Sequence, residues 1–84
     1  MTREELQEIF ELEEYEWEGD NALKGLQILA KYKDIVLIGA GYEVIYSLRI
    51  SEVLELGLTK EDADALRRLN WMLDSERDCL ACFV

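Results

Sequence analysis

Hydrophobic positions recur with helical spacing in the first part of the chain. One apolar stripe consists of Leu6, Ile9, Phe10 and Trp17. A repeat of three or four residues places such side chains on one face of an α-helix. Thr2 followed by Glu5 three positions later is a capping-box pattern, which indicates a helix start. The pattern predicts a first helix that continues to about Trp17. Glu13 falls inside the stripe, so either the packed face is narrow or the helix is shorter.

A second helix is predicted over residues 21–33, with Asp20 at its N-cap. Its apolar stripe is formed by Leu23, Leu26, Leu29 and Ala30. Gly25 within this helix disfavours helix by roughly 1 kcal/mol relative to alanine. We therefore expect Gly25 to permit close packing by a neighbouring element.

The middle of the chain predicts a β-hairpin followed by two helices. Two β-branched runs, Ile35–Ile38 and Val44–Leu48, flank Ala40–Glu43, where Gly39 and Gly41 would let the chain reverse. The pattern then predicts a short helix over 52–56, capped by Ser51 and ended by Gly57. Thr59 with Asp62 repeats the capping-box pattern and predicts a further helix to about Asn70.

A second hairpin is predicted at the end, with strands Trp71–Leu73 and Cys79–Val84 joined by the polar turn 74–78. The element order ααββααββ predicts an α+β fold in which about four helices cover a small, mostly antiparallel sheet. We expect a single domain over residues 1–84, divided into an acidic amphipathic helix, 1–18, and an α+β body, 20–84.

Negative charge is concentrated at the start of the chain. The protein has a net charge of −10, and residues 1–20 contribute nine acids against Arg3 alone, a net of −8. Nucleic acids and anionic lipids are bound through lysine and arginine. The sequence therefore predicts no direct nucleic-acid or membrane partner, and it favours a partner protein with a basic surface.

Motifs for cofactors, metals and catalysis are incomplete. Gly39 and Gly41 match two places of a dinucleotide loop, but Val44 occupies the third and a strand follows, so a hairpin is expected instead. The chain has no histidine, the commonest general base. We expect no enzyme activity, no cofactor and no metal site.

Two smaller patterns have simpler interpretations. Residues three apart in a strand point to opposite faces, so Cys79 and Cys82 are expected as buried structural cysteines, with a zinc site shared across a dimer as the alternative. Acids at Glu61, Asp62 and Asp64 suit the positive end of a helix dipole better than a cation loop.

The first helix carries the strongest binding hypothesis. Leu12 and Tyr15 do not join its apolar stripe and project among acids, where they could anchor a partner. The predicted partner-binding set is Glu8, Glu11, Leu12, Glu14, Tyr15, Trp17 and Glu18. Tyr42 and Glu43, at the expected tip of the first hairpin, are a secondary candidate. Two alternatives stay open: a solvated helix face, or a homodimer formed through this helix or the hairpins.

Four segments resemble a group of small acidic proteins encoded by bacteriophages and prophages: NALKGLQILAKY, IGAGYEVIYS, GLTKEDADALRRLNWMLD and DCLACFV. The resemblance covers roughly residues 21–84 and transfers no activity to these positions. It implies a bacterial host and a role as a modulator or inhibitor of a host protein, such as a defence complex. The cytoplasm is predicted, because no apolar run approaches the ~18–20 residues of a membrane helix and the chain begins with a charged helix pattern instead of a secretory signal. The predicted function is non-catalytic protein binding; a homo-oligomeric accessory protein is the alternative.

Overall fold

The computed structural model describes residues 1–14, 20–34 and 37–83. Within them, helices and strands follow one another in the predicted order. The elements are α1 (Arg3–Glu11), α2 (Asn21–Leu29), β1 (Gly39–Gly41), β2 (Val44–Arg49), α3 (Ile50–Glu55), α4 (Lys60–Arg68), β3 (Met72–Asp74) and β4 (Cys79–Phe83). The α+β class and the order ααββααββ are therefore confirmed.

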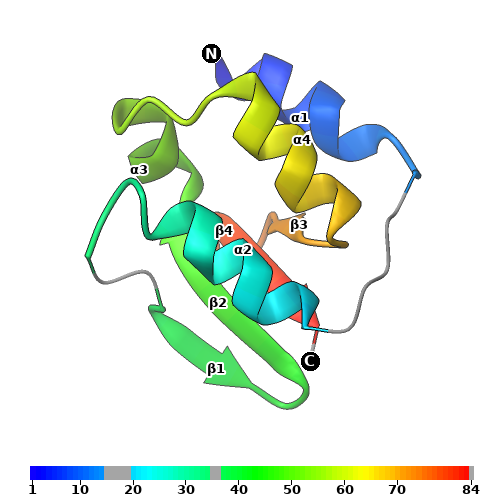
Figure 1. Cartoon of the computed structure of the whole chain (residues 1–84), viewed down its shortest axis with the longest axis vertical. Coiled ribbons are helices and arrows are strands. Elements are labelled where there is room, and N and C mark those ends of the chain that lie inside the picture. The colour runs from blue at the N-terminus through cyan, green and yellow to red at the C-terminus, as the bar shows by residue number, and fades with distance from the viewer. Residues whose placement is uncertain (15–19, 35–36, 84) are drawn as a thin grey trace.

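The four strands form one antiparallel sheet in the order β1-β2-β4-β3. Both predicted hairpins are present, and pairing of β2 with β4 joins them. A register shift between Tyr46 and Arg49 adds one residue to β2 opposite β4, as in a β-bulge. In Figure 1, α1 and α4 lie at the top, away from β1, while α2 crosses in front of β2 and β4.

The helices pack on one face of the sheet. Strand β4 alternates between the two faces: Leu80 and Cys82 belong to the buried core cluster, whereas Cys79 and Ala81 do not. The helices contribute Leu6, Leu29, Val53, Ala63 and Leu66 to the same cluster. Burial of such side chains contributes about 1.5–3 kcal/mol each, so this single core accounts for how the elements hold together.

The close approach expected at Gly25 is confirmed. The indole of Trp71 lies over Gly25 and donates to the carbonyl oxygen of Asn21 at 3.0 Å. This contact sets the rotation of α2, whose buried residues are Asn21, Gly25 and Leu29. The predicted stripe is therefore only partly correct, because Leu23 is 53% exposed and Ala30 is also exposed.

The predicted capping box of α1 is confirmed, but the helix is shorter than predicted. The Glu5 N–H donates to Thr2 Oγ1 at 3.1 Å, and the Thr2 N–H donates to Glu5 Oε1 at 3.0 Å. The helix ends at Glu11, and Leu12 is extended. Acids crowd the negative end of the helix dipole there, and the last turn has no base. The part of the prediction that falls on residues 15–17 lies outside the described residues.

Helix α2 also ends earlier than predicted, at Leu29 instead of residue 33, where Ala30 is its C-cap. The residue predicted at the N-cap is confirmed in its position. Asp20 occupies the N-cap, although its side chain makes no capping hydrogen bond.

Helix α3 begins before the predicted capping residue. Ser51 lies inside the helix, and Arg49 is the N-cap. The reason is that β2 runs directly into α3, with the Ile50 N–H bonded to the Asp78 carbonyl at 2.9 Å. Gly57 has the predicted left-handed conformation, with a φ of 83°. The Leu58 N–H then reaches back to the carbonyl of Val53 at 3.0 Å, the long bond of a Schellman motif.

Helix α4 begins at the predicted cap, where Thr59 Oγ1 accepts from the Asp62 N–H at 3.1 Å. The reciprocal bond of a capping box, from the Thr59 N–H to the Asp62 carboxylate, is replaced, because this carboxylate pairs with Lys31 and the Tyr32 hydroxyl. The helix ends at Arg68, two residues before the predicted Asn70.

The first hairpin turns later than predicted. Gly39 and Gly41 lie in β1 instead of the connection, and the turn consists of Tyr42 and Glu43. Glu43 takes the left-handed φ of 60°. Gly41 permits a close contact instead: a Cβ there would lie 3.3 Å from the Tyr46 hydroxyl oxygen. Of the predicted strand 35–38, residues 35–36 lie outside the described residues.

The second hairpin is confirmed, although its described strands are Met72–Asp74 and Cys79–Phe83. Trp71 precedes β3 and packs in the core instead of pairing as a strand residue. Val84 lies outside the described residues. Among the described helices, none combines the length and apolar character needed to cross a membrane.

Candidate functional site: the acidic face of the first helix

Helix α1 presents a row of acids on the side away from the core. Leu6 is fully buried, and Ile9 and Phe10 pack against the core. Three exposed acids lie three and four residues apart on the opposite side, so they share a face. We call this row the acidic crest; it consists of Glu4, Glu8 and Glu11.

An apolar hollow lies on one flank of the acidic crest. Leu12 is 52% exposed, as predicted, and borders a hollow of 270 Å³ whose other lining residues are Glu5, Glu8, Ile9 and Lys60. Lys60 Nζ lies 2.7 Å from Glu5 Oε2 and closes the hollow at one side. We call it the Leu12 hollow. It places a half-exposed aliphatic side chain directly beside two carboxylates.

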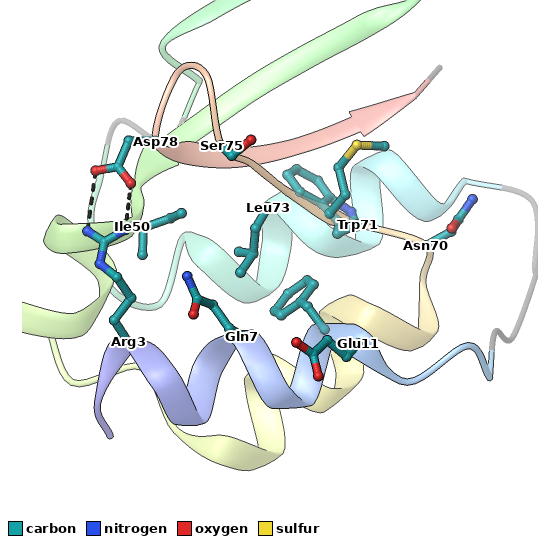
Figure 2. Close-up of a pocket in the computed structure, with 11 residues that line it drawn as sticks. Arg3, Gln7, Glu11, Ile50, Asn70, Trp71, Leu73, Ser75 and Asp78 are labelled. Atoms are coloured by element: carbon teal, nitrogen blue, oxygen red, sulfur yellow. Dashed lines mark hydrogen bonds and ion pairs between the residues drawn. The ribbon is translucent and has the colours of Figure 1, made fainter.

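A larger groove lies on the other flank of α1, between this helix and β3. Its volume is 630 Å³. Figure 2 shows its two ends: Arg3 reaches Asp78 at one, and Asn70 lies at the other. The Arg3 guanidinium donates to both Asp78 carboxylate oxygens, at 2.6 and 3.3 Å. We call this the α1–β3 groove. Sequence reasoning missed it, because it is bounded by residues more than sixty positions apart.

A buried arginine holds the segment that follows α1. Arg67 is 4% exposed, and its Nη1 donates to the Glu14 carbonyl oxygen at 2.6 Å. Its Nη2 pairs with Asp64, and its Nε has no hydrogen-bond partner among the described residues. Arg67 therefore ties residue 14 to α4 beyond the helix end. The sequence offers no signal for this role, since an arginine in the last turn of a helix ordinarily serves the helix dipole.

The described part of the predicted partner-binding set lies on α1 and in the three residues after it. Glu8 and Glu11 lie on α1, and Leu12 and Glu14 follow it directly; all four are exposed. The three remaining residues, Tyr15, Trp17 and Glu18, lie outside the described residues.

The secondary candidates lie elsewhere. Tyr42 and Glu43 form the tip of the β1–β2 hairpin, where Tyr42 is 90% exposed. In Figure 1 this hairpin lies at the bottom of the molecule and α1 at the top. The tip is thus a separate surface and does not extend the acidic crest.

Hydrogen bonds and ion pairs hold two carboxylates near α1 in their charged form, those of Glu5 and Asp78. The Lys60 ammonium and the Thr2 N–H lower the pKa of Glu5 to about 2. Hydrogen bonding to the Arg3 guanidinium lowers the pKa of Asp78. The same Glu5 contact raises the pKa of Lys60. The charges of Arg3, Glu5, Lys60 and Asp78 are therefore held in ion pairs, whereas the acidic crest on the opposite side of α1 from the core faces solvent.

The two cysteines are free and buried, as predicted. Burial raises the pKa of both thiols, and the nearby Asp74 carboxylate adds to the effect at Cys79. They lie on opposite faces of β4, since only Cys82 belongs to the core cluster. Within the described ranges, no three histidine, cysteine or acidic side chains are grouped so that they could hold a metal ion.

The acids at the start of α4 serve structural contacts. Asp62 pairs with Lys31, and Asp64 pairs with Arg67 and Arg68. Their position in and just after the first helical turn agrees with the expected helix-dipole role.

No family model matches this chain, and no curated protein or solved structure matches it either.

Proposed function

We propose that this protein is a non-catalytic binding module whose acidic crest and Leu12 hollow contact a basic surface on a partner protein. The observation that carries the proposal is the position of Leu12, half-exposed between carboxylates and beside an apolar hollow. Contact with another molecule would bury this side chain and remove it from water. The surrounding acids then select a partner that brings lysine or arginine.

Charge and apolar contact have different roles in this proposal. The acidic crest attracts a basic surface over a distance and accelerates encounter. Leu12 and its hollow supply the contact that excludes water and slows dissociation. The capping box and the core contacts of Leu6 already fix α1, and the bond from Arg67 to the Glu14 carbonyl fixes the segment after it. Little conformational entropy is therefore lost on binding.

The partner that we propose is a bacterial host protein, bound in the host cytoplasm by a phage or prophage modulator. The sequence resemblance to phage-encoded proteins supports this context. A protein surface that normally holds nucleic acid has the required positive charge, so a defence complex that binds DNA or RNA is a suitable target class. By occupying such a surface, an acidic module would inhibit its partner.

Affinity capture from a bacterial lysate tests the proposal. The tagged wild-type chain is compared with a variant in which two crest acids and Glu14, which follows α1, are replaced: Glu8→Lys, Glu11→Lys and Glu14→Lys. We call it the crest variant. The wild type should retain a partner with a basic surface, and the crest variant should lose it. The test requires that the retained protein then bind the purified wild type directly.

A matched control separates local charge from total charge. Asp34, Glu55 and Glu76 are exposed and lie outside α1. Replacing these three acids by lysine changes the net charge by the same amount as the crest variant does. The control variant should retain the partner. Loss of the partner in both variants would mean that only total charge matters, which contradicts a defined site.

Association between two copies is the second candidate, favoured by the face of the sheet that the helices leave free. Val44 and Phe83 are register partners on that face, and Phe83 is 55% exposed. A second copy could cover this apolar pair. Light scattering after size exclusion tests the idea: a dimer that Phe83→Glu converts to a monomer supports it, and a monomeric wild type contradicts it.

A further inference from the structure

We infer that the α1–β3 groove binds an extended segment of the partner, in which one bulky apolar side chain is flanked by lysine or arginine. This inference rests on the proposed function and specifies the chemistry of the partner. Its basis is that the groove combines an apolar floor, an edge strand and an unpaired carboxylate on one flank of the acidic crest.

The floor of the groove is apolar and aromatic. Its apolar lining residues are Phe10, Ile50, Trp71, Met72 and Leu73. A volume of 630 Å³ falls within the range of about 300–1,000 Å³ typical of ligand sites. Trp71 and Ile50 are themselves buried and fixed by the core, so the floor is rigid. A rigid apolar floor suits a large aliphatic or aromatic side chain, which gains most from losing contact with water.

The wall formed by β3 favours an extended segment. Strand β3 is the last strand of the sheet and pairs only with β4. An edge strand offers backbone N–H and carbonyl groups on its free side, and an extended peptide can pair with them. Figure 2 shows residues that line the groove from both sides: Gln7 and Glu11 come from α1, and Leu73 and Ser75 come from β3 and the turn after it.

The charges of the groove favour a basic segment. Three charged residues line it, and two of them, Arg3 and Asp78, neutralise each other in a bidentate ion pair. The third is Glu11, which also belongs to the acidic crest; no ion pair joins it to another described residue. A lysine or arginine next to the inserted side chain would therefore meet Glu11 first and the other crest acids next.

Synthetic peptides and methyl NMR test this inference. The probes are short peptides with a central leucine or phenylalanine between lysines, compared with peptides that have alanine at the centre or glutamate at the flanks. The chain contains two methionines, Met1 and Met72. Labelling methionine methyl groups with ¹³C therefore gives two signals, one of them from Met72, which lines the groove. The lysine-flanked leucine or phenylalanine peptide should shift the Met72 signal, and both comparison peptides should bind at least about tenfold more weakly.

Two glutamines provide a matched pair of variants. Gln7 lines the groove on α1, and Gln27 is exposed on α2 away from it. Gln7→Trp places an indole in the groove and should weaken peptide binding about tenfold or more. Gln27→Trp makes the same exchange outside the groove and should leave binding unchanged. Circular dichroism checks that both variants keep the fold.

The outcomes separate this inference from the proposed function. Suppose that a basic peptide binds and that Glu8→Lys abolishes this binding, while the Met72 signal does not shift and Gln7→Trp has no effect. This result would contradict binding in the α1–β3 groove but would still support binding through the acidic crest. Equal binding of peptides with leucine and alanine at the centre would also overturn it. A Met72 shift that is lost in Gln7→Trp and retained in Gln27→Trp supports the groove as the partner's binding site.

Discussion

The indole of Trp71 occupies the space where a side chain at residue 25 would lie. A Cβ built on Gly25 would be 2.0 Å from Trp71 Nε1, far inside van der Waals contact. The same nitrogen donates to the Asn21 carbonyl oxygen, one turn earlier in α2. One glycine therefore determines how α2 packs on the core, and through Trp71 it also determines the floor of the α1–β3 groove.

Gly25→Ala should destabilise the protein even though alanine favours helix. At an unobstructed position the exchange would stabilise a helix by about 1 kcal/mol. Here the added methyl group must displace the Trp71 indole and break its hydrogen bond, so we expect a net loss of about 2–3 kcal/mol in the free energy of unfolding. Urea denaturation measures it.

The same exchange in a Trp71→Leu background is the control. With the indole removed, Gly25→Ala should cost much less than it does in the wild type, because the two positions are coupled. Equal costs in the two backgrounds would show that the packing of Trp71 on Gly25 is not the cause.

The Glu5 carboxylate should make the protein sensitive to acid. Its pKa is about 2 in the folded protein against an ordinary value of 4.5. A lowered pKa means that its contribution to stability is complete above about pH 4.5 and is lost as the pH falls toward 2. Glu5→Gln removes this contribution, so wild type and variant should differ most near neutral pH and converge below pH 3.

Urea denaturation across this pH series gives the measurement. Glu4→Gln is the matched control, since Glu4 lies on the same turn and no ion pair joins it within the described residues. Its profile should follow that of the wild type. If the free energies of unfolding of the wild type and Glu5→Gln differ by the same amount at every pH, the pairing of Glu5 with Lys60 is contradicted.

Arg67 should act as a positioning residue for the segment after α1. Arg67→Met keeps most of the side-chain volume but removes the bond to the Glu14 carbonyl. Hydrogen bonds from charged groups contribute about 1.5–3 kcal/mol, so we expect a loss of stability in this range. Partner affinity should fall as well, because the segment that carries Leu12 and Glu14 is no longer held to α4.

Arg68→Met is the comparison, because Arg68 is less buried and pairs with the same Asp64. It should reduce stability less and leave affinity nearly unchanged. If Arg67→Met lowers stability but not affinity, the positioning role is wrong.

The cysteine thiols should react slowly with a soluble thiol reagent in the folded protein. Both are fully buried, and burial raises both pKa values, which reduces the fraction of reactive thiolate. Reaction should become fast for both in concentrated urea. Rapid, complete modification of the folded protein would show that β4 opens readily or that the thiols are accessible.

Local patterns predicted most of the fold. Thr2 with Glu5, Thr59 with Asp62, and Gly57 each occupy the helix-end position that their chemistry favours. Such signals act within four residues, so the sequence displays them directly. The two hairpins were also predictable, because β-branched and apolar runs flank polar or glycine-bearing connections.

The errors arose where distant residues decide the structure. Gly39 and Gly41 resembled turn residues, but both lie in β1, where Gly41 accommodates the Tyr46 side chain of the neighbouring strand. Ser51 resembled a helix cap, but the bond of the Ile50 N–H to Asp78 starts the helix earlier. The α1–β3 groove and the Arg67 tether join segments far apart in sequence, so no local pattern could reveal them.

The salt dependence of partner affinity tests the central claim most directly. The dissociation constant of the captured partner is measured across a range of ionic strength for the wild type, the crest variant and the matched control with lysine at 34, 55 and 76. We predict that affinity falls with salt for the wild type and the control, and that the crest variant binds at least about tenfold more weakly at low salt. Equal affinities in all three proteins, unchanged by salt, would contradict binding through the acidic crest.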